Sequence, residues 1–433
     1  MFKRTIEGNL VKWKESSIRK PLILRGARQV GKTSIVRKFA TENFEEFVEI
    51  NLEKSDYKKL FRDVDNISEF ITKAEFVSKK NIVEGKTLLF IDEIQESIDV
   101  LNLLRFFAED KPNLHVIVAG SLLEAKLLDG WKIPVGRVDY MYLYPMTFFE
   151  YIYAIDDKKI LEQPEITRYL LEKHFKDYLI IGGMPEAINS YSKEKKLEPV
   201  RTVHERLISS YNDDIDKYAK DFEKKYLQLV VNFGPRIAGE IYKYEKFGDS
   251  EYRGREIRDA IDSLQKTMIL KEIPSINSVN IPLIPKLKRG KKMIWLDIGI
   301  VNHFNNVQLD IMSGNYKWKI MEQYVGQTLL SSGINRKFDL YYWAKNKDEG
   351  SAEVDFCFQY KDKIVAIEVK SGATKEMKSL FSMIDTGGDT ILPIRISWDK
   401  LGIEKYQHGN KKYKILSVPF YLLEKWQELI NLL

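Results

Sequence analysis

The sequence has little cysteine and histidine, the residues on which disulfide-bonded and zinc-binding folds depend. A single cysteine, Cys357, excludes an internal disulfide framework, and the five histidines are scattered without metal-ligand spacing. No run reaches the roughly 18 apolar residues of a membrane helix, and the charged N-terminal segment lacks the apolar core of a secretory signal. We therefore expect a cytoplasmic protein with no membrane partner.

A strong excess of charge of one sign is also missing. The chain has 69 basic and 63 acidic residues, a formal charge of +6, which is compatible with a nucleic-acid partner but does not require one. Clustered charge attracts phosphate, although a solvated loop explains such a cluster equally well. The clustered basic residues are Lys286, Lys288, Arg289, Lys291 and Lys292.

Residues 21–40 predict a strand, a glycine-bounded loop and a helix, in that order. In the loop, Gly26 is followed after four residues by Gly31, Lys32 and Thr33, which is the spacing of a P-loop. Its backbone N–H groups wrap phosphates at a helix N-terminus, the lysine supplies charge and the threonine hydroxyl binds Mg²⁺. The pattern therefore predicts that ATP is bound by Gly26, Ala27, Arg28, Gln29, Val30, Gly31, Lys32, Thr33 and Ser34.

A second motif, LLFIDEIQ at residues 88–95, reads as a buried parallel strand that ends in Asp92 and Glu93. Ligands of α/β sheets bind at the carboxyl ends of the strands. We expect Asp92 to hold Mg²⁺ together with Thr33, and Glu93 to polarise the attacking water. The pair predicts an ATPase, with Lys32 as a further catalytic residue, although a scaffold that ATP only stabilises is an alternative.

The next apolar strand, LHVIVAGS at residues 114–121, predicts Ser121 at the same edge of the sheet. This strand resembles the sensor-1 strand of AAA+ ATPases. A serine that caps a helix at residues 122–128 explains the residue equally well.

Three stretches carry a wider resemblance: LRGARQVGKTS, the segment GRVDYMYLYPMTFFEY from Gly136, and GGMPEA at residues 182–187. They are similar to a large prokaryotic family that pairs an AAA+ domain of the AAA_14 type with a C-terminal region known as DUF4143. The resemblance covers essentially the whole chain. It suggests Arg137 as a charge-stabilising finger, with a surface arginine as the alternative. Similarity to signal-transducing ATPases suggests that Pro185 approaches the nucleotide.

Residues 226–300 predict a winged helix. Helices are expected at 226–233 and 237–244, then a long amphipathic helix with Ile257 and Ile261, and two extended runs that flank the basic loop. DNA binding and a purely structural connector are equally good interpretations. In the first, a DNA groove meets the third helix, which would carry Arg253, Arg255, Arg258 and Lys266.

Residues 352–372 predict a hairpin around a Lys361-Asp362 turn. Residues two apart in a strand share a face, so Asp355 with Glu353, and Glu368 with Lys370, should project together. Asp355 and Glu368 can then hold Mg²⁺, while Lys370 orients or activates water for phosphodiester cleavage. A hairpin with its charged face in water is the alternative.

The hairpin resembles the core of the restriction-endonuclease-like, or PD-(D/E)xK, superfamily. That core often has a helical glutamate, a role that Glu322 matches, but the proline usually found before the first acid is missing here. Such a fold persists in some proteins after catalysis is lost. Nuclease activity and binding without cleavage both stay open.

These patterns predict an α/β protein that couples ATP binding and Mg²⁺-dependent hydrolysis to a DNA-binding or nuclease-like domain. The alternative is a nucleotide-dependent switch or scaffold whose inactive nuclease-like domain serves protein docking or oligomerisation. DNA, another nucleic acid, a protein and a second copy of the chain all stay open as partners. The predicted domains are a P-loop AAA+ ATPase at 1–165, a helical lid at 166–225, a winged helix at 226–310 and a restriction-endonuclease-like (DUF4143) domain at 311–433.

Overall fold

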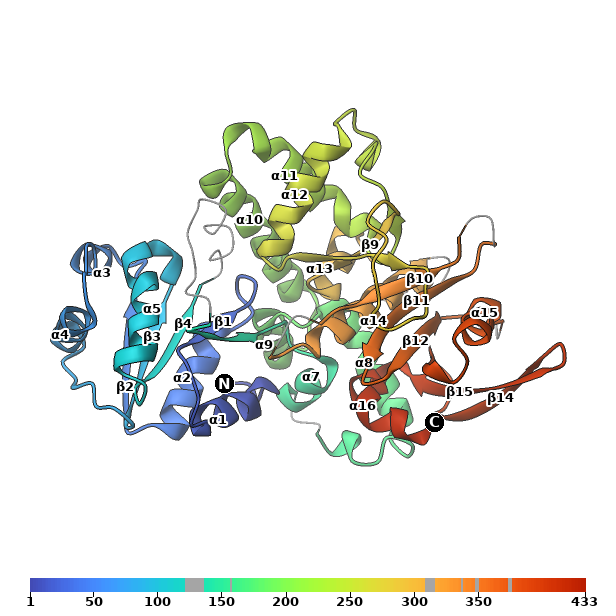
Figure 1. Ribbon diagram of the computed structural model, residues 1–433, viewed down its shortest axis with the longest axis horizontal. Coiled ribbons are helices and arrows are strands. Elements are labelled where there is room, and N and C mark those ends of the chain that lie inside the picture. The colour runs from blue at the N-terminus through green and yellow to red at the C-terminus, as the bar shows by residue number, and fades with distance from the viewer. Residues whose placement is uncertain (121–135, 156–157, 308–315, 336–337, 347–349, 373–375) are drawn as a thin grey trace. The chain divides into compact units, whose positions relative to one another are not determined.

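The computed structural model (Figure 1) describes residues 1–120, 136–155, 158–307, 316–335, 338–346, 350–372 and 376–433. The chain forms two compact units. The first unit comprises residues 1–146, 266–269 and 333–337, and the second comprises 147–265, 270–332 and 338–433. In these described ranges no helix is long and apolar enough to cross a membrane.

A five-stranded parallel sheet organises the first unit, with strand order β2-β3-β4-β1-β5. Strand β4 lies between β1 and β3, so the carboxyl end of β4 is flanked by the ends of the two strands that carry the sequence motifs. Ligand sites of parallel sheets lie at this edge. The strands are β1 (Leu22–Arg25), β2 (Glu46–Asn51), β3 (Thr87–Asp92), β4 (His115–Ala119) and β5 (Asp139–Tyr142).

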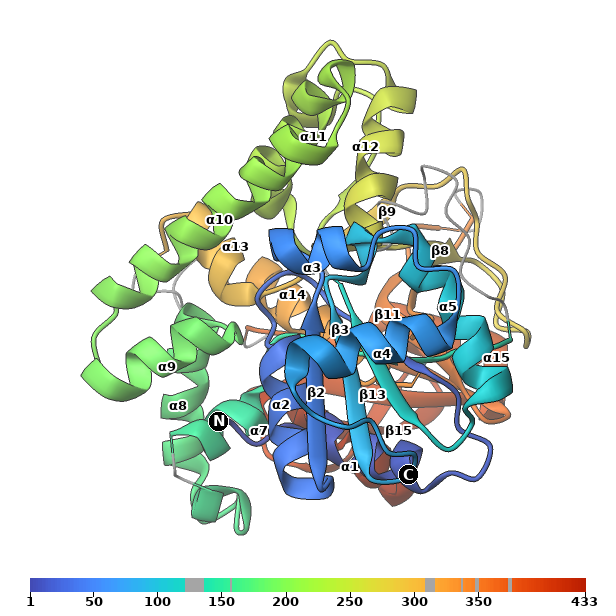
Figure 2. The ribbon, with the colours of Figure 1, turned by 90° about the vertical axis from the view of Figure 1, so that its left-hand side faces the viewer.

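Helices cover this sheet, so its central strands are buried on both faces and read as continuous apolar runs. Every residue of β3 is buried. Figure 2 shows α4 lying across the sheet at β2, and Phe70 of α4 packs edge-to-face on Phe107 of α5 with ring centroids 5.7 Å apart. The helices are α1 (Ile6–Glu15), α2 (Lys32–Asn43), α3 (Ser55–Leu60), α4 (Ile67–Ser78) and α5 (Ile98–Asp110).

The second unit begins with helices, and the predicted lid segment is helical as expected. Helix α9 starts with Pro185 in its first turn, where a backbone N–H would have no acceptor within the helix and is therefore not needed. The helices are α7 (Phe148–Ala154), α8 (Arg168–Ile181), α9 (Pro185–Glu194), α10 (Glu198–Tyr218) and α11 (Asp221–Phe233).

A small three-stranded sheet follows, with order β6-β9-β7. It contains β6 (Ile241–Tyr242), β7 (Leu270–Ile273) and β9 (Lys291–Trp295), and helix α12 (Gly254–Lys266) lies between β6 and β7 in the sequence. The helix predicted at residues 237–244 is wrong. Gly239 has a φ of +83°, which interrupts a helix, and the next residues form β6 and pair with β9.

A seven-stranded sheet completes the second unit, with order β14-β15-β13-β12-β11-β10-β8. Its centre is the predicted hairpin, in which β11 and β12 pair antiparallel around Lys361 and Asp362. Helix α14 (Tyr316–Ser331) packs on both β9 and β12. The strands are β8 (Ser275–Ile276), β10 (Tyr341–Ala344), β11 (Glu353–Tyr360), β12 (Lys363–Lys370), β13 (Ile391–Ser397), β14 (Gly402–His408) and β15 (Lys411–Pro419).

Three further helices belong to this unit: α13 (Ile298–Phe304), α15 (Lys378–Gly387) and α16 (Trp426–Leu429). Helix α15 packs on β11 and β13. Strand β8 belongs to the segment between β7 and β9, yet it pairs with β10 of the large sheet. The two sheets of the second unit therefore share one continuous piece of chain.

Candidate nucleotide site and acidic cluster

The phosphate loop connects β1 to α2 and depends on glycine at both ends. A Cβ atom at Gly26 would lie 2.5 Å from the backbone oxygen of Leu143, so no larger residue fits there. Gly31 precedes α2 with a φ of +97°, a conformation that other residues rarely adopt. The loop therefore leads directly into the N-terminus of α2, where the free backbone N–H groups favour the binding of phosphate.

Lys32 is buried at the start of α2, and its ammonium group turns back on the loop. Its Nζ donates to the backbone oxygens of Gly26 and Ala27, each at 2.9 Å. Burial lowers the pKa of Lys32 to about 8, against the opposing effect of the nearby Glu93 and Asp92 carboxylates. A bound phosphate would supply the negative charge that this buried amine lacks.

Thr33 and Asp92 meet across the ends of α2 and β3. The Thr33 hydroxyl donates to Asp92 Oδ2 at 2.8 Å. Burial raises the pKa of Asp92, and the hydrogen bond from Thr33 partly offsets that effect. A hydroxyl and a carboxylate side by side are a donor set that suits Mg²⁺, so these two side chains fit the predicted metal position.

Glu93 follows directly in a left-handed backbone conformation, with φ of 54° and ψ of 47°. Non-glycine residues in this region are strained, and such strain concentrates at functional sites. Gln95 Nε2 donates to Glu93 Oε2 at 2.5 Å and fixes the carboxylate. Sequence reasoning missed Gln95, although it stands within the same FIDEIQ motif, two residues after the acid.

The other predicted residues of the first unit take varied positions. Arg28, Gln29 and Ser34 are exposed on or beside the loop. Arg137 is also exposed, and its Nε donates to Glu109 Oε1 at 2.8 Å, so its role as a finger stays a prediction. Ser121 lies outside the described residues.

Pro185 belongs to the second unit, where the turn before α9 is clamped by a buried carboxylate. Asp297 Oδ2 accepts from the backbone N–H of Gly183 at 2.6 Å, and Oδ1 accepts from that of Ile300 at 3.2 Å. Gly182 has a φ of +73°, and a Cβ there would lie 2.1 Å from Asp297 Oδ1. The GGMP sequence is thus explained by a packed turn, and nucleotide contact by Pro185 stays a prediction.

The hairpin acids of the second unit gather around a lysine. Lys292 of β9 is 2% exposed, and its Nζ lies 2.7 Å from Glu322 Oε2, 3.3 Å from Glu353 Oε1 and 3.3 Å from Asp355 Oδ1. Burial alone would lower the pKa of Lys292, but the three carboxylates together raise it, so the ammonium stays charged. Sequence reasoning placed the acids together but missed this cation.

Glu368 and Lys370 of β12 form a second ion pair beside the first, 2.7 Å apart. Burial, followed by the charge of Asp355, raises the pKa of Glu368. The other oxygen of Glu368 has no hydrogen-bond partner among the described residues. Over the same residues, no three His, Cys, Asp or Glu side chains are grouped so that they could hold a metal ion. The carboxylates here are paired with lysines, whereas Asp92 is paired with the neutral hydroxyl of Thr33.

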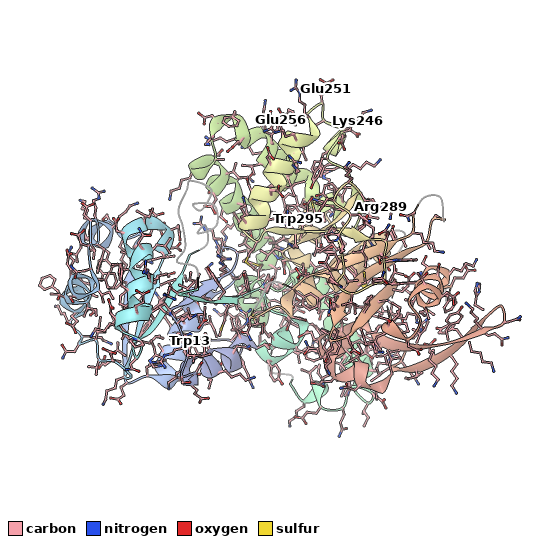
Figure 3. The ribbon with its side chains drawn as sticks, in the orientation of Figure 1. Trp13, Lys246, Glu251, Glu256, Arg289 and Trp295 are labelled. Atoms are coloured by element: carbon pink, nitrogen blue, oxygen red, sulfur yellow. The ribbon has the colours of Figure 1, made fainter. Side chains whose placement is uncertain are left out.

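The clustered basic residues at positions 286–292 do not form one exposed patch. Lys291 Nζ bonds to Glu272 Oε2 at 2.8 Å, and Arg289, labelled in Figure 3, donates to the backbone oxygens of Ala344 and Lys345. Because side chains alternate along a strand, Lys292 of β9 points to the interior. Only Lys286 and Lys288 of this run are exposed.

Family models match three stretches of the chain. They are an AAA domain at residues 18–152, a domain of unknown function (DUF8612) at 172–310 and a domain of unknown function (DUF4143) at 318–395. No curated protein matches the sequence.

Three solved structures with some similarity to this chain are distant. Drosophila ORC bound to DNA is 17% identical over 69% of this chain and 93% of its own, with a TM-score of 0.30. The Thermotoga maritima RuvB Holliday junction branch migration motor is 15% identical over 65% of this chain and 91% of its own, with a TM-score of 0.28. C. elegans PCH-2 is 11% identical over 61% and 67%, with a TM-score of 0.23. Scores this low carry no argument about function.

The parallel sheet, the glycine-bounded loop and the acidic strand end define the first unit as a P-loop domain of the AAA+ kind. The chain as a whole combines this AAA domain with a C-terminal DUF4143 domain, which confirms the resemblance read from the sequence.

Proposed function

We propose that the first unit binds Mg·ATP and hydrolyses it. The observation that carries the proposal is the 2.8 Å contact between the Thr33 hydroxyl and Asp92 Oδ2 at the end of a buried parallel strand. It brings the two sequence motifs, 59 residues apart, to one point of the sheet edge. A P-loop spacing alone would be a weaker indication of ATP hydrolysis, because it would lack an acidic strand end such as Asp92 beside the threonine.

Each group has a defined task. The backbone N–H groups of residues 26–34 bind the phosphates, and Lys32 compensates their charge. Thr33 and Asp92 hold Mg²⁺, which neutralises charge that develops on the phosphates. Glu93 orients and polarises the attacking water, and Gln95 keeps its carboxylate in place.

Phosphate release and nucleotide binding, measured on the full chain, test the proposal. Lys32→Ala should lose both, while Glu93→Gln should bind ATP normally and hydrolyse it roughly 100-fold more slowly, as for loss of a general base. Lys38, which is partly buried on the same helix and paired with Glu7, gives the matched control: Lys38→Ala should behave as the wild type. If Glu93→Gln keeps full turnover, the assignment of the water-polarising residue is wrong.

We further propose that the nucleotide state regulates the second unit. Two hypotheses stand for the DUF4143 domain: nucleic-acid cleavage by Asp355, Glu368 and Lys370, or docking of a protein partner or a second copy without cleavage. Metal-dependent DNA cleavage that is present with ATP and lost in Asp355→Ala supports the first. Hydrolysis of ATP with no cleavage under any condition supports the second.

DNA binding by the predicted winged-helix segment at residues 226–310 is a second candidate function, favoured by the surface of α12. The side chains of Arg255 and Arg258 are 83% and 51% exposed, and each lies beside Asp259, at 3.9 and 3.8 Å. Arg253 lies just before the helix, and not on it as predicted, but is also exposed. The loop before β9 adds the exposed Lys286 and Lys288. Exposed basic side chains on a helix and a loop can contact the phosphates of a duplex, although α12 also carries Glu256, Asp259 and Asp262.

Fluorescence anisotropy with a DNA duplex at several salt concentrations tests this candidate. Arg255→Glu combined with Arg258→Glu should weaken binding and reduce the salt slope by about one for each phosphate that the protein no longer neutralises. Arg206→Glu on α10, where the side chain is 66% exposed, is the control in the same unit. Equal affinity of all three proteins would point to the structural-connector interpretation.

A further inference from the structure

The acidic cluster of the second unit, which consists of Glu322, Glu353, Asp355 and Glu368, receives its cation from a different sheet. The acids lie on α14, β11 and β12, whereas Lys292 lies on β9 of the three-stranded sheet. Its Nζ contacts three of the four carboxylates at 2.7–3.3 Å. An ammonium at such distances is in direct contact with each oxygen.

Several of the oxygens that a catalytic metal would need are already paired, although Glu368 Oε2 has no hydrogen-bond partner among the described residues. Asp355 Oδ1 faces Lys292 at 3.3 Å, and Asp355 Oδ2 accepts from the backbone N–H of Val369 at 2.7 Å. Glu368 Oε1 is paired with Lys370 at 2.7 Å. A divalent cation binds six or more oxygens without an ammonium among them, so Lys292 and a metal compete for Asp355.

Lys292 is held in this position by its strand. Its backbone pairs with Ile241 of β6 and with Ile273 of β7, so β9 is the central strand of its sheet. The next residues, Met293 and Ile294, are fully buried. Because the side chain is also 2% exposed, the ammonium cannot swing into solvent without disrupting the sheet. Lys292 therefore differs from a surface lysine that pairs transiently with an acid.

We propose that Lys292 is the resident cation of this cluster and occupies the place that a nuclease-like site would give to a divalent metal. The hairpin is then a metal-independent structure that four carboxylates and two lysines hold together. Its ion pairs tie the three-stranded sheet to the large sheet. The inference is independent of ATP hydrolysis in the first unit, and for the second unit it favours docking without cleavage over the metal-dependent cleavage considered above.

Binding of Mn²⁺ to the nucleotide-free full chain, followed by electron paramagnetic resonance, tests the proposal. The wild type and Asp355→Asn should bind equal amounts of Mn²⁺, because the cluster contributes no site. Lys292→Met should melt at a lower temperature and gain one bound Mn²⁺, which Asp355→Asn removes again. Millimolar Mn²⁺ should restore part of the melting temperature of Lys292→Met but leave that of the wild type unchanged.

Two outcomes would overturn the proposal. The first is Mn²⁺ bound by the wild type and lost in Asp355→Asn, which would show a metal beside Lys292. The second is a Lys292→Met variant as stable as the wild type and without affinity for Mn²⁺. If Lys292→Met does not fold, the comparison of the wild type with Asp355→Asn decides alone. Lys291→Met, which removes the neighbouring lysine, is the matched control and should gain no Mn²⁺ site.

Discussion

Gln95 holds the carboxylate of Glu93 through a 2.5 Å hydrogen bond, and Glu93 itself has a left-handed backbone. Two features therefore restrict the position of Glu93, the acid proposed to polarise water: its backbone conformation, with a φ of 54°, and the hydrogen bond from Gln95. Fixed geometry is what a general base needs, since small displacements of such a group slow catalysis strongly.

Gln95→Ala should lower turnover while nucleotide affinity stays unchanged. The carboxylate of Glu93 keeps its chemistry but loses its anchor, so we expect a kcat about tenfold lower, which corresponds to about 1.4 kcal/mol in the barrier. Steady-state phosphate release gives kcat and KM separately. A KM that changes as much as kcat would show that Gln95 supports the nucleotide pocket as a whole and not Glu93 in particular.

Gly120→Ala, directly after the neighbouring strand β4, should disturb the same pair. A Cβ at this position would lie 2.1 Å from Gln95 Oε1, so the glutamine must move. We expect a loss of about 1–3 kcal/mol in unfolding free energy, the usual cost of overpacking, and a lower kcat. Denaturant unfolding checks the first and phosphate release the second. Combined with Gln95→Ala, the substitution should cost much less stability, because the clashing side chain is gone.

The phosphate loop and the acidic strand end could be predicted because each is a contiguous pattern whose spacing reflects one local structure. The hairpin around Lys361 was predicted for the same reason. The helix predicted at residues 237–244 was wrong, because the apolar spacing there suits a helix, but Gly239 and the pairing of β6 with β9 override that pattern.

Lys292 shows why the rest could not be predicted. In the sequence it closes a basic run that reads as an exposed loop, and only the register of β9 sends its side chain inward. Its partners Glu322 and Asp355 lie 30 and 63 residues away. Contacts between residues so far apart in the sequence depend on how strands and helices pack, and a local hydrophobic pattern does not show this packing. Gln95 is the opposite case, since its position beside Glu93 was visible in the motif.

Asp297→Ala should destabilise the second unit. It leaves the backbone N–H groups of Gly183 and Ile300 without their carboxylate acceptor in a buried turn, and a buried unsatisfied donor costs about 1–3 kcal/mol. Thermal melting of the full chain measures the loss. Asp297→Asn keeps one acceptor oxygen and should be milder. If both variants melt as the wild type does, this carboxylate is not the clamp of the GGMP turn.

The second unit should also lose stability in mild acid through His204. The ring is buried on α10, its Nε2 lies 3.0 Å from the backbone oxygen of Ile181, and His303 packs against it with ring centroids 5.6 Å apart. Burial, followed by the charge of His303, lowers the pKa of His204 to about 4. An unfolded histidine titrates near pH ~6.5 and so binds a proton more readily than the folded one.

Because the unfolded state binds more protons between pH ~6.5 and ~4, the unfolding free energy falls as the pH drops through this window, and it is unaffected above it. The lowered pKa of His204 corresponds to a loss of at most about 3 kcal/mol in the unfolding free energy. Denaturant unfolding at a series of pH values should show this slope, and His204→Gln should reduce it at a cost in stability at neutral pH. His408, a histidine on the exposed strand β14, offers the control: His408→Gln should leave the slope unchanged. An identical slope in all three proteins would assign the acid sensitivity to other groups.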